Sequence, residues 1–180
     1  MFEQANTPRI LVIRRDNIGD LVCTTPVFHA LRIKFPQAHI CALVNSYNLP
    51  VLENNADIDL AFAYTKAKHR PPEKSLMGVY IDRLRLMYKL RRMRFDYVIL
   101  NESLQQVLHP QKVILEALRV GKRVVVGIPN FCHIRARVQI FFEGRVPITK
   151  ELPYEWYNTP NLRFLSLKDF RKFCKVNGIK

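Results

Sequence analysis

The sequence contains no uninterrupted apolar run of about 18 residues, the length that would indicate a membrane-spanning helix. Residues 1–8 lack both the basic and the apolar region of a secretory leader. These two absences favour a cytoplasmic protein. The four cysteines are widely spaced, with no C-x-x-C pair and no histidine at ligand spacing, so we expect neither a metal site nor a disulfide framework.

Acidic residues are also scarce, which leaves a formal net charge of +14 on 180 residues. The excess is shared, because residues 1–100 carry 15 basic and 9 acidic side chains and residues 101–180 carry 14 and 6. A spread charge of this kind favours acidic partners, such as a phosphorylated glycolipid, a nucleotide or the inner face of a membrane. No nucleic-acid-binding motif is present, which argues against nucleic acid.

Apolar runs that fit strands alternate with segments of helical periodicity. Such alternation predicts a Rossmann-like α/β fold of three layers, with a mostly parallel five-stranded sheet between helices. The Thr24-Thr25-Pro26 sequence supplies an N-cap candidate for the first long helix, and residues 15–20 before it read as a loop. Gly121 stands where a left-handed helix cap is expected. The strands are predicted at residues 9–14, 39–44, 60–64, 97–100 and 123–128, and the helices at 24–35, near 50, 76–94, 111–120, 133–142 and 166–177.

The first half carries a Gly19-Asp20 pair in the loop after the first strand, followed by Thr25-Pro26. With "ILVIRRDNIGDLVCTTPVFHALRIKFPQAHICALV", "NNADIDLAFAY" and "FDYVIL", residues 8–100 resemble the N-terminal domain of glycosyltransferase family 9, the ADP-heptose:lipopolysaccharide heptosyltransferases. This resemblance implies an acceptor-binding domain in which Asp20 is the general base. It further implies acceptor-binding residues, which we assign to Arg15, Asn17, Gly19, Arg85 and Arg92.

Two alternatives apply to these residues. Asp20 can instead satisfy the free amides at a helix start. The basic residues of the helix that holds Arg85 and Arg92 can simply be a solvated face. The nucleotide-sugar lobe of the family has no counterpart in the sequence, so we expect no bound ADP-heptose.

The second half contains Pro129-Asn130-Phe131, Gly144-Arg145 and the aromatic stretch from Leu152 to Pro160. From Phe95 onward it resembles the MetW methionine-biosynthesis family, which has the class I S-adenosylmethionine methyltransferase fold. The glycine-rich turn and the acidic residue that hold the cofactor in that fold are missing, because the first loop offers only Gly19 and the second strand ends at Asn45. We therefore expect no S-adenosylmethionine. If the chain is an enzyme, heptosyl transfer suits it better than methylation.

The MetW resemblance implies a non-catalytic role in methionine biosynthesis, with a homoserine O-acyltransferase as partner. A heptosyltransferase-like acceptor-binding fragment in lipopolysaccharide biosynthesis is the alternative, and a product of gene rearrangement without a selected function is a third. The aromatic loop is the best contact surface, since tyrosine, tryptophan and arginine are enriched at interface hot spots, although it can also be ordinary core. The partner-binding candidates are Asn130, His133, Arg135, Tyr154, Trp156 and Tyr157.

Both families begin with a sheet of strand order 3-2-1-4-5, and "FDYVIL" at residues 95–100 fits the fourth strand of either. We therefore predict that residues 1–100 and 101–180 merge into one globular domain at that strand. The fifth strand would then be an uncovered edge, which favours self-association.

Overall fold

The computed structural model describes residues 7–14, 17–65, 75–101, 103–149, 153–159 and 161–179. The chain forms two compact units, each described here by itself. Unit 1 contains residues 1–101 and 111–126, and unit 2 contains residues 102–110 and 127–180. The chain therefore leaves unit 1 after the fourth strand, returns to it for the fifth, and leaves it again.

Unit 1 is built on a five-stranded sheet of order β3-β2-β1-β4-β5. The registers of β1 with β2, β1 with β4 and β2 with β3 are parallel. This confirms the predicted Rossmann-like fold, including its strand order. The strands are β1 (Arg9–Ile13), β2 (His39–Asn45), β3 (Leu60–Tyr64), β4 (Phe95–Asn101) and β5 (Gly121–Gly127).

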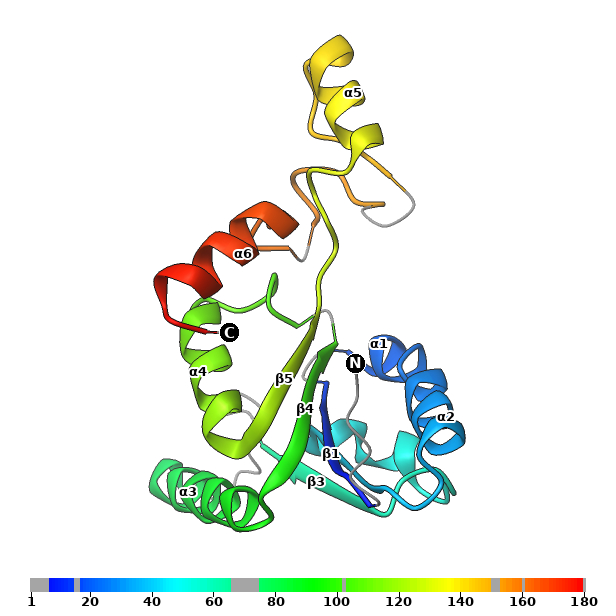
Figure 1. Cartoon of the computed structure of the whole chain (residues 1–180), viewed down its shortest axis with the longest axis vertical. Coiled ribbons are helices and arrows are strands. Elements are labelled where there is room, and N and C mark those ends of the chain that lie inside the picture. Colours follow the sequence, from blue (N-terminus) through cyan, green and yellow to red (C-terminus); the bar gives the residue numbers. More distant parts are fainter. Residues whose placement is uncertain are drawn as a thin grey trace. The chain divides into compact units, whose positions relative to one another are not determined.

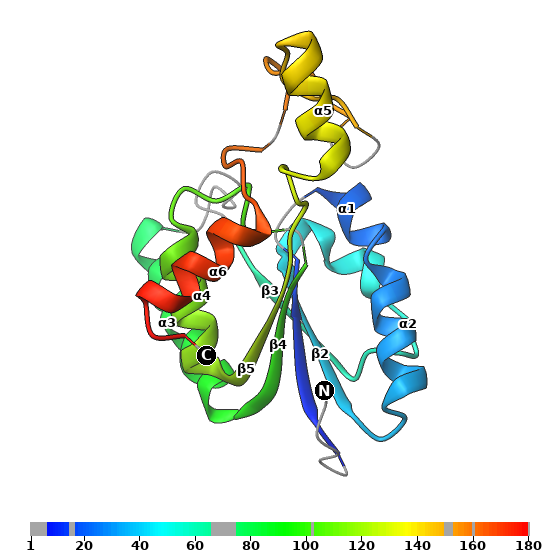
Figure 2. The same cartoon turned by 45° about the horizontal axis from the view of Figure 1, so that its top comes forward.

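Helices cover both faces of the sheet, with α1 and α2 on one face and α3 and α4 on the other (Figures 1 and 2). These helices are α1 (Ile18–Val22), α2 (Thr25–Lys34), α3 (Leu76–Arg92) and α4 (Pro110–Val120), and the 3-10 helix η1 (Ser46–Leu52) follows β2. Unit 2 contains α5 (Ile134–Glu143) and α6 (Leu167–Val176).

The core of unit 1 follows the pleat of its strands, in which successive side chains point to opposite faces. Ile10, Val12, Ile40 and Val44 belong to one buried cluster with Phe28 of α2. The intervening residues point to the other face, under α3 and α4. That face is packed less completely, since Val79 and Leu90 are the only buried residues of α3.

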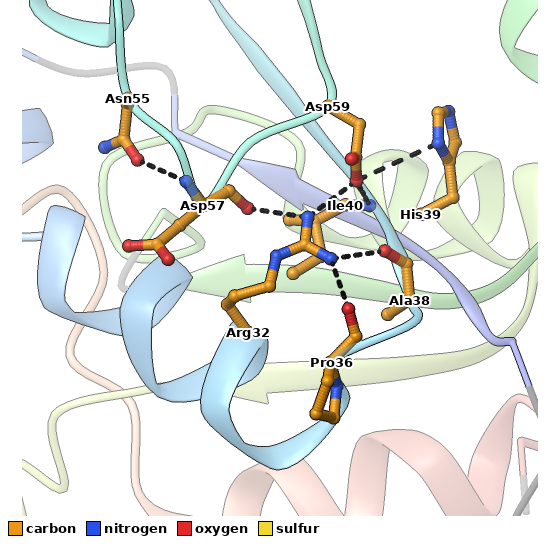
Figure 3. Close-up of polar contacts among 8 residues, drawn as sticks. All are labelled: Arg32, Pro36, Ala38, His39, Ile40, Asn55, Asp57 and Asp59. Atoms are coloured by element: carbon orange, nitrogen blue, oxygen red, sulfur yellow. Dashed lines mark hydrogen bonds and ion pairs between the residues drawn. The ribbon is translucent and has the colours of Figure 1, made fainter.

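The face under α2 is closed at the amino ends of β2 and β3 by the side chain of Arg32 (Figure 3). Its guanidinium donates to the carbonyl oxygens of Pro36 (3.0 Å), Ala38 (2.8 Å) and Asp57 (3.1 Å) and to the Asp59 carboxylate (2.8 Å). The Asp59 carboxylate also accepts from the backbone N–H at the start of β2, at 2.6 Å. One side chain thus fixes the turn after α2 and the start of β3.

Two local predictions are wrong, and a third is confirmed only in position. Residues 18–20 are not loop, because they begin the short helix α1. Thr24 is the N-cap residue of α2, as expected, but its side chain makes no capping hydrogen bond, since its hydroxyl donates to the Asp20 carbonyl oxygen at 2.8 Å. Gly121 is not a left-handed cap, because it is the first residue of β5, and the positive-φ glycines of the described residues are Gly144 and Gly178.

Close packing explains Gly121 instead. A Cβ atom at this position would lie 2.5 Å from Cγ2 of Val98, a fully buried residue of β4. The absence of a side chain therefore lets β5 approach β4.

Candidate functional site

The first candidate site lies where β1 ends, at the carboxyl edge of the sheet in unit 1. Arg14 follows β1 directly and is only 4% exposed. One of its terminal nitrogens lies 3.4 Å from Oδ1 of Asp20, and the other donates to the carbonyl oxygen of Asn101 at the end of β4. The backbone N–H of Asn17 donates to Oδ2 of Asp20 at 3.4 Å. Both oxygens of this carboxylate are therefore already engaged.

Thr24 completes this carboxyl-edge cluster, which consists of Arg14, Asn17, Asp20, Thr24 and Asn101. The buried Thr24 hydroxyl donates to the Asp20 carbonyl oxygen and lies 3.4 Å from the Asn101 side-chain nitrogen, which donates to it. The Asp20 side chain remains 37% exposed, so a hydroxyl group from solution can reach it. Open space also lies beside Gly19, where an added Cβ would have no atom within 4 Å.

The predicted acceptor-binding residues are not gathered in one place. Asn17 and Gly19 lie beside Asp20, and Arg15 lies outside the described residues. Arg85 is exposed on α3. Arg92, at the end of α3, lines a basic groove of about 710 Å³ together with Arg9 and His39, the first residues of β1 and β2. Because β1 and β2 begin there, Arg92 lies at the opposite edge of the sheet from Asp20.

The second candidate site is the aromatic loop of unit 2. Trp156 is 71% exposed and Tyr157 is 70% exposed, and their rings meet edge to face with centroids 5.8 Å apart. Tyr154 is less exposed and lines a small pocket with Phe131 and Phe164, whose own rings lie 4.3 Å apart. The loop is therefore anchored on an aromatic pair and displays two large rings to solvent.

Helix α5 adds further exposed aromatic surface to unit 2. Phe141 is 81% exposed and Phe142 is 77% exposed, and Ala136 is the only buried residue of the helix. Sequence reasoning did not single out these two residues, because a helical pattern alone does not show which faces of the helix remain uncovered. It also missed Arg14. An arginine directly after an apolar strand is expected to be buried, and a buried cation requires polar partners nearby.

The remaining partner-binding candidates have local structural contacts. The Asn130 side chain accepts from the backbone N–H of Leu167, the first residue of α6, at 3.4 Å. His133 is the N-cap of α5, and its Nδ1 accepts from the backbone N–H of Arg135 at 3.5 Å. Arg135 is exposed. Asn130 and His133 thus position two helices, and Arg135 is the member of this group whose side chain is free to meet a partner.

The described residues contain no cluster of three or more cysteine, histidine, aspartate or glutamate side chains that could hold a metal ion. The four cysteines are free thiols. Within the same described ranges, every helix is too short or too polar to cross a bilayer.

Comparison with known protein families gives one match that covers more than half of the chain. Residues 74–180 match the model of the family described as methionine biosynthesis protein MetW. This chain belongs to the MetW family. The match begins ahead of Phe95, where the sequence resemblance begins, and so includes α3 as well as β4, α4, β5 and unit 2.

A curated MetW relative is the bifunctional methionine biosynthesis protein MetXA/MetW of Rhodopirellula baltica. It is 40% identical over 79 residues, which is 43% of this chain but only 13% of the relative. The present MetW chain therefore spans a small part of that protein's length.

Solved structures similar to this MetW chain include glycosyltransferases. The Escherichia coli heptosyltransferase WaaC with ADP has a TM-score of 0.50 and 16% identity, over 74% of this chain and 39% of that one. The glycosyl transferase family 9 structure from Veillonella parvula has a TM-score of 0.50 and 17% identity, over 99% and 52%. At these identities the likeness shows a common fold, in agreement with the resemblance of the first half.

Proposed function

We propose that this chain acts in methionine biosynthesis as a non-catalytic MetW protein that binds a homoserine O-acyltransferase through the aromatic loop of unit 2. Membership of the MetW family supports the pathway. The curated relative joins MetXA and MetW in a single bifunctional protein, which is in keeping with two components that work side by side.

The observation that carries the proposal is the exposure of Trp156 and Tyr157 inside the MetW segment. Large exposed apolar rings are costly in a protein that remains alone and are typical of the centre of an interface. Glu155, which precedes Trp156, has Arg145 at 4.0 Å, so the loop also offers a polar rim.

Co-purification of the full chain with a homoserine O-acyltransferase tests this proposal. We expect Trp156→Ala and Tyr157→Ala each to weaken the complex by about tenfold to a hundredfold, the usual effect at an interface hot spot. Tyr80→Ala is the matched control, since Tyr80 is another largely exposed aromatic residue (62%), on α3 of unit 1. The proposal is wrong if the Trp156→Ala and Tyr80→Ala variants bind the acyltransferase equally well.

A second candidate is an acceptor-binding role in heptosyl transfer, with Asp20 as the base. It is favoured by one observation, the 37% exposed Asp20 carboxylate at the carboxyl edge of a parallel sheet. Arg14 and the Asn17 N–H each occupy one acceptor site of the carboxylate, and a second lone pair on each oxygen could take a proton. Heptose transfer that is absent, or that survives Asp20→Asn, removes this candidate.

A further inference from the structure

Unit 1 contains an apolar pocket that neither function uses. It lies between the sheet and the two helices α3 and α4, and its volume is about 440 Å³. Its floor consists of Leu11, Ile13 and Leu43, which point away from the cluster under α2 because they alternate with it along β1 and β2. The volume falls in the usual range of small-molecule sites, roughly 300–1,000 Å³.

The walls of the pocket are apolar over most of their length. Leu86, Met87 and Leu90 of α3 face Val113, Ala117 and Val120 of α4 across it. From Arg83 to Leu90 and from Lys112 to Val120 the two helices advance about 10–12 Å, which is about the length of an eight- to ten-carbon chain. An extended hydrocarbon therefore fits between them better than a flat ring system does.

One end of the pocket is cationic. Arg83 of α3 and Lys112, in the first turn of α4, both line it, and the Tyr64 that ends β3 lies at the same edge. The Nη2 of Arg83 donates to the Thr65 carbonyl oxygen at 3.1 Å, whereas its buried Nε has no hydrogen-bond partner among the described residues. A buried N–H without an acceptor is unfavourable, so an acceptor that enters the pocket would relieve it.

The one carboxylate that lines the pocket does not neutralise the positive charges of Arg83 and Lys112. Glu116 is held on its outer side by Arg119 at 2.7 Å and by Arg91 at 3.1 Å. Lys112 has no acidic partner within the part of the chain that the structure describes. The amino end of α4 adds a favourable potential for an anion at the same place.

The geometry points to a binding site for an amphipathic carboxylate, with its head between Arg83 and Lys112 and its unbranched tail directed toward Leu90 and Val120. The polar end of the pocket lies at the carboxyl edge of the strands and the apolar end at their amino edge, so the ligand has one orientation. This site shares no residue with the aromatic loop or with the carboxyl-edge cluster.

Calorimetric titration of the full chain with straight-chain carboxylates from hexanoate to tetradecanoate tests the site. We expect the Kd to fall about fourfold for each added methylene that enters the pocket, and to level off at about eight to ten carbons. We expect 1-decanol, which lacks the charge, to bind about tenfold more weakly than decanoate. Absence of binding overturns the proposal. Affinity that increases through tetradecanoate without levelling off also overturns it, because it indicates surface adsorption.

Variants separate the head from the tail. Lys112→Gln and Arg83→Gln should each weaken every carboxylate by a similar factor, about fivefold to tenfold, and leave the effect of each methylene unchanged. Lys34→Gln is the charge-matched control, since Lys34 is exposed at the end of α2 on the other face of the sheet. Equal losses in the Lys112 and Lys34 variants would overturn the proposed position of the head.

Ala117→Phe is expected to fill the tail region and abolish the dependence on chain length, because Ala117 is 5% exposed and lines the pocket. Circular dichroism establishes that each variant is folded. If this variant does not fold, Val113→Trp tests the same region from a half-buried position. A folded variant of either kind that retains the chain-length series refutes the tail position.

Discussion

Replacing Gly121 by alanine is expected to destabilise unit 1 by about 1–3 kcal/mol. The added Cβ would lie 2.5 Å from Cγ2 of Val98 and 3.5 Å from the carbonyl oxygen of Phe95. Val98 is fully buried and β-branched, so its side chain cannot turn away at low cost. The expected loss therefore comes from overpacking between β4 and β5, and not from backbone strain.

A double-mutant cycle separates these two causes. Val98→Ala alone should cost about 2 kcal/mol, through lost burial and the cavity it leaves. In the double variant the new methyl group at position 121 occupies part of that cavity. The double variant should therefore lose about 1–3 kcal/mol less stability than the sum of the two single losses. Urea denaturation followed by circular dichroism measures all four proteins.

Gly144→Ala is the matched control. Gly144 ends α5 with φ of 62°, and no atom lies within 4 Å of an added Cβ. Its cost of about 1–2 kcal/mol arises from the left-handed backbone, and Val98→Ala should not reduce it. Additive losses at Gly121 and Val98 would show that close packing is not the reason for this glycine.

Three further predictions concern stability and chemical reactivity. Arg32→Met should cost about 2–4 kcal/mol in urea denaturation, because it removes a donor from the buried Ala38 carbonyl and from the Asp59 carboxylate, which keeps the Ile40 N–H. The exposed pair of Arg91 should be worth under about 1 kcal/mol, and equal losses would contradict the closing role of Arg32. Burial opposes ionisation of Asp59, but the Ile40 N–H and Arg32 outweigh it and lower the pKa of Asp59 from 3.8. The stability that Asp59 contributes is therefore complete above that pH and is lost as the pH falls through the folded pKa. In an acid titration, Asp59→Asn should lose stability less steeply than the unchanged protein, and an equally steep loss would be the contrary result. Burial, and then the charge of Asp59, raises the pKa of Cys41 to about 12. Iodoacetamide at pH 8, with mass spectrometry as the readout, should therefore alkylate the exposed Cys132 and reach Cys41 only on unfolding. Rapid labelling of Cys41 in the native protein would refute its burial.

The strands and the long helices were predictable because their patterns agree with their environment. Residues 9–14 are apolar and branched, and the structure buries Ile10, Leu11 and Val12 between two layers of helices. The helix expected over residues 166–177 is α6, and the Ser166 hydroxyl before it accepts from the Asp169 N–H at 3.0 Å. The sheet order followed from family resemblance, since periodicity alone does not determine which strands are neighbours.

The contacts that distinguish the candidate sites were not predictable in the same way. Arg92 shares a helix with other basic residues, but the direction of α3 takes it to the amino edge of the sheet and away from Asp20. The Asp20 carboxylate has Arg14 and Asn17 as partners, which no local pattern shows. The reason for Gly121 is its contact with Val98, which lies 23 positions earlier in the chain, so the local pattern indicated a helix cap instead. Long-range contacts of this kind require the folded chain.

The route of the backbone bears on any attempt to divide the protein. Residues 102–110 belong to unit 2, and the Gln105 carbonyl oxygen there accepts from the N–H groups of Leu162 (2.8 Å) and Arg163 (3.0 Å). A shortened gene that starts at residue 127 would delete this acceptor and leave both donors to water. Expression trials of the C-terminal part should therefore carry the 102–110 segment along, either by starting upstream of β4 or by grafting it through a designed connection.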